Sequence, residues 1–69
     1  MEQFKLRDEF IRLGQLLKAA GMVDSGVTAK EVIVNGEVKV NGEVEIRRGK
    51  KLVAGDIVEF EGNQIRVCE

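Results

Sequence analysis

The sequence has 69 residues, 43% hydrophobic and 33% charged, with a formal net charge of −1. A chain of this length buries only about 60% of its unfolded surface, so we expect a single domain over residues 1–69 that binds ligands at its surface. With no histidine and one cysteine, the composition excludes nitrogen and sulfur metal sites, and the small net charge excludes long-range attraction of nucleic acid by the chain as a whole.

The apolar residues occur in short runs, which excludes a transmembrane helix. Residues 1–6 lack the basic start, apolar stretch and cleavage site of a signal peptide, so we expect a cytoplasmic protein with no membrane partner. Cys68 cannot form an internal disulfide, which agrees with a reducing compartment. We interpret it as apolar filler or as an exposed terminal thiol.

The first elements predicted are a short extended piece and a helix. Residues 4–6 are expected to be extended. A helix is predicted over residues 12–20, and Gly21 follows at the position of a left-handed C-terminal cap. Its apolar stripe has the spacing i, i+3, i+4 and i+7 and consists of Leu13, Leu16, Leu17 and Ala20.

A second helix is predicted over residues 26–35. Asp24 and Ser25 are both good N-cap residues, and Gly36 ends the helical pattern. The apolar positions that repeat the helical spacing are Ala29, Val32 and Ile33.

After the second helix the apolar period changes from 3.6 to 2, and residues 41–42 (Asn-Gly) give a strong hairpin signal. A two-residue turn there would pair Val40 with Glu43 and place a carboxylate on the apolar face. A three-residue loop with the glycine in the left-handed position pairs Val38 with Val44 instead, and we predict this bulged form.

A last hairpin is predicted around a two-residue Gly62-Asn63 turn, which would pair Phe60 with Ile65. Residues 53–56 are predicted to form a turn between the two hairpins. The order of elements indicates an α+β fold, with two helices packed on one face of a small curled antiparallel sheet.

Catalytic residue types are nearly absent. Without histidine or tyrosine, acid-base chemistry would need buried carboxylates or lysines, which so thin a core hardly provides, so we do not expect an enzyme and expect no cofactor. The three phenylalanines (Phe4, Phe10 and Phe60) are assigned to the core. Stacking platforms for single-stranded bases are therefore not expected.

The residue types that remain suit phosphate binding. Residues 47–51 read Arg-Arg-Gly-Lys-Lys, and their four cations are Arg47, Arg48, Lys50 and Lys51. Arginine and lysine donate charge-assisted hydrogen bonds to phosphate oxygens, so this segment is a candidate binding site for a folded RNA. A solvated loop that aids solubility is the alternative, because a basic run of four is not specific.

From residue 13 to residue 60 the sequence resembles the S4 RNA-binding domain with its αL motif. The matching features are Leu16-Leu17-Lys18 before Gly21, Ser25 followed by Ala29 and Lys30, the segment from Gly36 to Gly42, and Gly55-Asp56 before Ile57. The short start and the basic segment are most similar to small stand-alone bacterial S4 proteins.

The resemblance implies binding of structured RNA, often ribosomal or transfer RNA. It implies RNA contacts from the two helices and the hairpin, at Lys18, Ser25, Thr28, Lys30, Lys39 and Asn41, with the basic segment extending this surface. Many members place an arginine directly after the serine that begins the second helix, whereas this chain has Gly26, which shifts the expected weight of binding toward residues 47–51.

The expected function is thus a monomeric RNA-binding module that contacts backbone phosphates, with ribosomal RNA or a tRNA-like element as partner and a role in ribosome assembly or translation. The alternative is a protein-interaction module that docks an acidic partner, which the net charge of −1 favours somewhat.

Overall fold

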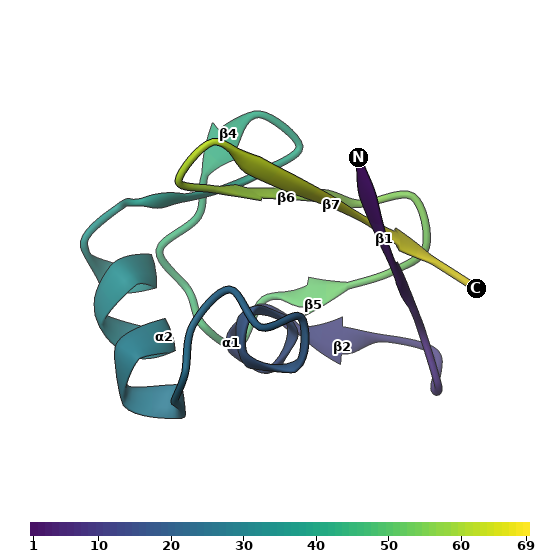
Figure 1. The fold of residues 1–69 in the computed structure, drawn as a ribbon, viewed down its shortest axis with the longest axis horizontal. Coiled ribbons are helices and arrows are strands. Elements are labelled where there is room, and N and C mark those ends of the chain that lie inside the picture. Colours follow the sequence, from purple (N-terminus) through teal and green to yellow (C-terminus); the bar gives the residue numbers. More distant parts are fainter.

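The computed structural model describes residues 1–69 as two helices and seven short strands. In chain order these are β1 (Glu2–Lys5), β2 (Ile11–Arg12), α1 (Leu13–Ala19), α2 (Gly26–Val34), β3 (Val38–Val40), β4 (Glu43–Val44), β5 (Lys51–Leu52), β6 (Ile57–Phe60) and β7 (Asn63–Cys68). Five strands form one sheet in the order β1-β7-β6-β3-β4, and β2 pairs with β5 in a second, two-stranded sheet. Both helices lie on the same side of the larger sheet (Figure 1), which confirms the predicted α+β architecture.

The larger sheet is mixed, which corrects the expectation of a purely antiparallel one. Strand β1 pairs in parallel with β7, with Phe4 opposite Val67, and the amide of Leu6 continues the ladder by donating to the Cys68 carbonyl at 2.8 Å. The Cys68 thiol lies 3.4 Å from the carbonyl oxygen of Phe4. The two ends of the chain are thereby held side by side.

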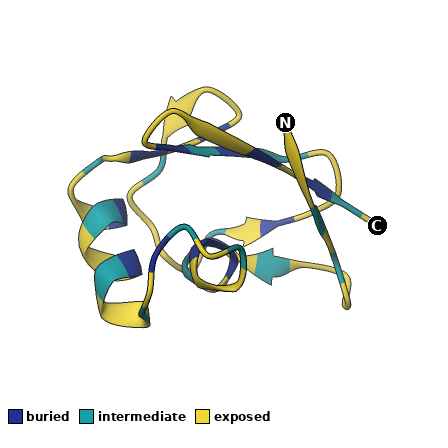
Figure 2. Cartoon of the chain, viewed as in Figure 1, coloured by how far each residue is buried: buried dark blue, intermediate teal, exposed yellow.

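The helices form where their sequence signals predict them. Ser25 caps α2 by accepting a hydrogen bond from the Thr28 amide at 3.2 Å, and Gly36 follows α2 with a φ of +76°. Both helices and the larger sheet carry buried residues (Figure 2), and these form one core, whose fully buried members include Leu13, Leu16, Leu17, Ile33, Val38 and Val58. With seven and nine residues, both helices are too short to span a bilayer.

The first hairpin has the two-residue turn, so the predicted three-residue loop is wrong. Asn41 and Gly42 have φ values of +53° and +86°, and Val40 pairs with Glu43. Two successive residues with positive φ give a turn whose twist matches that of the flanking strands. The side chain of Asn41 adds to this turn, because its Oδ1 accepts from the Ile57 amide at 2.9 Å and its Nδ2 donates to Asp56 at 3.0 Å.

This register places Glu45 on the apolar side of the hairpin, and an ion pair accommodates it there. The Arg47 guanidinium donates to both Glu45 carboxylate oxygens, from Nε at 2.9 Å and from Nη2 at 3.0 Å. These hydrogen bonds lower the pKa of Glu45 from 4.5 to about 2, although burial opposes the shift. Arg47 thus offsets the charge of Glu45 within the same loop, while Glu43, the carboxylate opposite Val40, stays exposed.

The last hairpin turns at Glu61 and Gly62, with φ values of +51° and +79°, so the predicted Gly62-Asn63 turn is wrong. Val58 lies opposite Ile65, a shift of two residues from the predicted register. Because side chains alternate with a period of two, this shift keeps the same residues on the inner face. The apolar alternation is thus satisfied by either register, and the turn decides between them.

Phe10 is outside the core, which corrects its assignment from the sequence. Phe4 and Phe60 contribute to the core or pack against it, whereas the Phe10 side chain is 37% exposed. It lies just before β2, on the segment that leads from β1 to the second sheet.

The bonds of Asn41 predict a stability difference between two glycine substitutions. Asn41→Gly keeps a residue that tolerates positive φ but removes both side-chain hydrogen bonds, so it should lower the free energy of unfolding by about 1 kcal/mol. Glu61→Gly is the matched control, because Glu61 also has positive φ but makes no side-chain hydrogen bond. It should leave stability unchanged or raise it. Urea denaturation of both variants checks this, and equal changes would contradict the role given to the amide.

The ion pair predicts a pH dependence at low pH. Since the folded pKa of Glu45 is depressed, its carboxylate stabilises the fold above about pH 4.5, and this contribution is lost as the pH falls toward 2. In Arg47→Gln, NMR titration should return the pKa of Glu45 toward 4.5, and the corresponding loss of stability below pH 4.5 should disappear. Lys50→Gln is the control, because the charge of Lys50 is the weakest cause of the shift. A pKa near 4.5 in the unmodified protein would contradict the pairing.

Candidate nucleic-acid interface

The basic segment is fixed to the start of α1 by its backbone. The amides of Leu13 and Gly14 donate to the carbonyls of Lys50 and Arg48, both at 2.9 Å. The first amides of a helix have no partner within the helix, so these loop carbonyls satisfy two of them. The Arg12 guanidinium adds a third tie by donating from Nη1 to the Gly49 carbonyl at 2.8 Å.

This docking creates a positively charged groove between α1, α2 and the loop. The groove has a volume of about 350 Å³ and is lined by Arg12, Gly14, Gln15, Lys18, Gly26, Ala29, Lys30, Arg48 and Gly49. Four of these residues are cations and none is an acid. We call Arg12, Lys18, Lys30 and Arg48 the groove cations. The elements that carry them are neighbours in Figure 1, where the chain between β4 and β5 passes beside α1.

The groove cations are not neutralised by neighbouring carboxylates. The single salt bridge in the structure joins Arg47 to Glu45, and neither residue lines the groove. The side chains of Lys18, Lys30 and Arg48 make no hydrogen bond within the protein, which leaves their donors free for an external anion. The positive potential is therefore local, despite the net charge of −1.

The N-terminus of α2 opens into the same groove at Gly26. Its first turn contains no acidic residue, and a side-chain carbon added at Gly26 would meet nothing within 4 Å. Helix N-termini attract anions through their free amides and the helix dipole. The helix therefore adds a favourable field to that of the four cations.

Ser25 and Thr28 are occupied in holding this helix end. The Ser25 hydroxyl accepts from the Thr28 amide and donates to the Thr28 hydroxyl, both at 3.2 Å. The Thr28 hydroxyl in turn donates to Asp24 at 3.2 Å. Their geometry is that of a helix cap that orients α2 beside the groove.

Lys39 and Asn41 are not brought into the groove. The strand register places Lys39 opposite Glu59 on the outer face of the sheet, away from the buried Val38 and Val40. Asn41 is bonded to β6 through Asp56 and the Ile57 amide. Both positions stay away from the helices.

The basic segment itself divides into residues with different surroundings. Arg48 lines the groove, and Lys50 lies beside it with its carbonyl bonded to α1. Arg47 is held by Glu45, and the Lys51 ammonium lies 4.8 Å from the centre of the Phe10 ring. The segment thus contributes one side chain to the groove and two more at its border.

Arg12 is the groove residue that sequence reasoning missed. It occupies the N-cap position of α1, where serine, threonine, asparagine or aspartate is preferred. A long cation at that position was a signal that the residue serves something other than capping. The Gln15 side chain compensates by accepting from the Arg12 amide at 3.2 Å.

Comparison with known proteins gives a consistent result. A chain similar in sequence is "Probable ribosome maturation protein RlbA" of Bacillus subtilis, 52% identical over 54 residues that make up 78% of this chain and 76% of that protein. YbcJ of Escherichia coli is 46% identical over 57 residues, 83% of this chain and 81% of YbcJ.

The solution structure of YbcJ superposes on the whole of this chain and 89% of that one, with a TM-score of 0.76 and 41% identity. That structure is described as revealing an αL motif involved in RNA binding. A family model described as S4 domain matches residues 4–68. Because the match covers nearly the full sequence and the fold agrees with it, the chain belongs to the S4 domain family.

Proposed function

We propose that this protein binds structured RNA by seating backbone phosphates in the groove between α1, α2 and the basic segment. The observation that carries this proposal is the convergence of the groove cations with no carboxylate among them. Arginine and lysine bind phosphate oxygens through charge-assisted hydrogen bonds, and the arginines can do so with two parallel bonds. The αL motif of YbcJ supports the choice of RNA.

The proposal describes a monomeric binding module and not an enzyme. The groove holds cations and backbone but no pair of groups suited to proton transfer or nucleophilic attack. Contacts to phosphates position a protein on RNA and read its shape without reading its sequence. Recognition should therefore depend on how the RNA is folded.

Ribosomal RNA during maturation of the ribosome is the proposed target, which makes the cytoplasm the site of action. The name of the Bacillus subtilis relative supports this choice over a tRNA-like element. The groove cations, with Lys50 and Lys51 at the border, would neutralise about four to six phosphates. The logarithm of the binding constant should then fall with the logarithm of salt concentration with a slope of about −3 to −5.

Replacing three groove cations should weaken binding in a salt-dependent way. Lys18→Gln, Lys30→Gln and Arg48→Gln together should flatten the salt slope by about 2, because each lost phosphate contact contributes roughly 0.7 to 0.9. Arg12 is left intact because it also holds the loop. Filter binding to ribosomal RNA helices at several salt concentrations measures the slope.

The matched control removes the same number of lysines and arginines elsewhere. Lys5, Lys39 and Arg66 alternate with inward-facing residues, so the strand register places them on the outer face of the sheet. Their triple glutamine variant should keep most of the slope. If both triple variants lose the same amount, attraction is general and the groove is not the binding site.

Restoring a cation at the start of α2 should strengthen binding. Gly26→Arg is sterically allowed, since open space surrounds its Cβ position, and the added guanidinium would lie at the groove beside the helix N-terminus. We expect tighter RNA binding and a salt slope steeper by about 1. Gly26→Ala is the control, because it shows how much of any gain in affinity comes from a more stable helix and not from the added charge. Equal affinities of the two variants would show that no phosphate passes this point.

A further inference from the structure

The exposed ring of Phe10 adjoins the cationic groove. The Arg12 guanidinium carbon lies 5.5 Å from the centre of the ring, and the Lys51 ammonium lies 4.8 Å from it. The same Arg12 lines the groove and donates to Gly49. A strand of RNA that leaves the groove along Arg12 would therefore meet an aromatic surface next.

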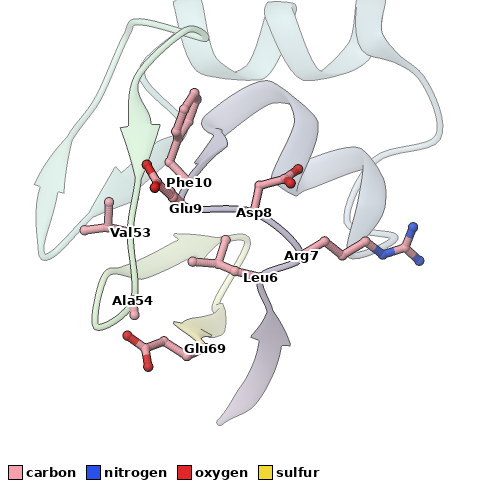
Figure 3. A pocket seen from close by; sticks show the side chains of 8 residues that line it. All are labelled: Leu6, Arg7, Asp8, Glu9, Phe10, Val53, Ala54 and Glu69. Atoms are coloured by element: carbon pink, nitrogen blue, oxygen red, sulfur yellow. The ribbon is translucent and has the colours of Figure 1, made fainter.

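A second hollow lies on the other side of Phe10. It has a volume of about 760 Å³, and its walls include the apolar side chains of Leu6 and Val53 and the carboxylates of Glu9 and Glu69, whereas the Asp8 side chain points away from Val53 (Figure 3). This volume lies within the range of sites that hold small molecules. Three carboxylates and one cation, Arg7, are thus among its lining residues, and the Arg12 and Lys51 cations lie beside Phe10.

We propose that Phe10 is a stacking platform for one unpaired base of the bound RNA, an inference that rests on the proposed function. The phosphate beside that base would stay on the side of Arg12 and Lys51, because Glu9 and Glu69 repel it from the hollow. The edge of the base would face the carboxylates, which accept hydrogen bonds from its amino or imino groups. The ligand is therefore an RNA with an unpaired nucleotide next to a structured region.

The relative strength of the contacts favours the base. A cation over an exposed aromatic ring strengthens an interaction by roughly 2- to 5-fold, whereas stacking of a base on such a ring strengthens binding by roughly 5- to 150-fold. A base can thus displace the flexible Lys51 side chain from the ring. The released ammonium then becomes available to the adjoining phosphate.

Two hairpin RNAs test this inference, one fully paired and the other identical except for a single unpaired adenine in its stem. The unmodified protein should bind the second at least 5-fold more tightly. Phe10→Leu keeps apolar bulk but removes the aromatic face, so it should lose this preference while its affinity for the paired hairpin stays within about 2-fold. Phe10→Trp should retain the preference. Because Phe10 lies outside the core cluster, these variants should fold.

The outcomes separate this inference from the proposed function. If neither hairpin binds at low salt, the proposed function fails. If both bind equally to the unmodified protein, or if Phe10→Leu weakens both alike, the stacking site is overturned while RNA binding by the groove stands. Intermolecular nuclear Overhauser effects between the Phe10 ring protons and the unpaired adenine should be present, and their absence in the bound complex would also overturn it.

Discussion

The amides that begin α1 donate to carbonyls of the basic segment, and the arrangement of the whole interface depends on these two bonds. Helix starts need acceptors, and here a loop 34 to 37 residues later supplies them at Arg48 and Lys50. The constraint acts on the backbone, so the charged side chains of the loop remain free to face outward. The basic segment is thereby held beside two helices, and of its four cations only Arg47 uses its charge within the fold.

The distribution of charge follows from the same constraint. The one ion pair forms inside the β4–β5 connection, between Glu45 and Arg47, and shapes the hairpin. At physiological salt, exposed charges more than about 8 Å apart are largely screened. No acid lines the groove, and acids beyond that distance do little to offset its charge. Because distant charges are screened, the residues that line a site decide its charge. A protein with net charge −1 can therefore present a strongly positive site.

Local signals predicted the helices well, and they failed where distant contacts or turn geometry decide. The caps at Ser25 and Gly36 involve residues only a few positions apart, so the sequence reveals them. The two hairpin registers were mispredicted because Asn41 and Glu61 adopt positive φ, which gives two-residue turns at residues 41–42 and 61–62 in place of a three-residue loop and a turn at residues 62–63. The pairing of β1 with β7 joins the ends of the chain. The apolar alternation within one strand does not reveal which other strand lies beside it.

The candidate site was only partly predictable, for a related reason. The resemblance and the basic run indicated Lys18, Lys30 and Arg48, which converge in the groove. Neither of them showed that Arg47 is paired with Glu45 and so differs from the other cations of the segment. Arg12 and Phe10 were missed because their neighbours, Gly49 and Lys51, are about 40 residues away. A phenylalanine is assigned to the core by default, and only the topology that pairs β2 with β5 places the Phe10 ring beside two cations.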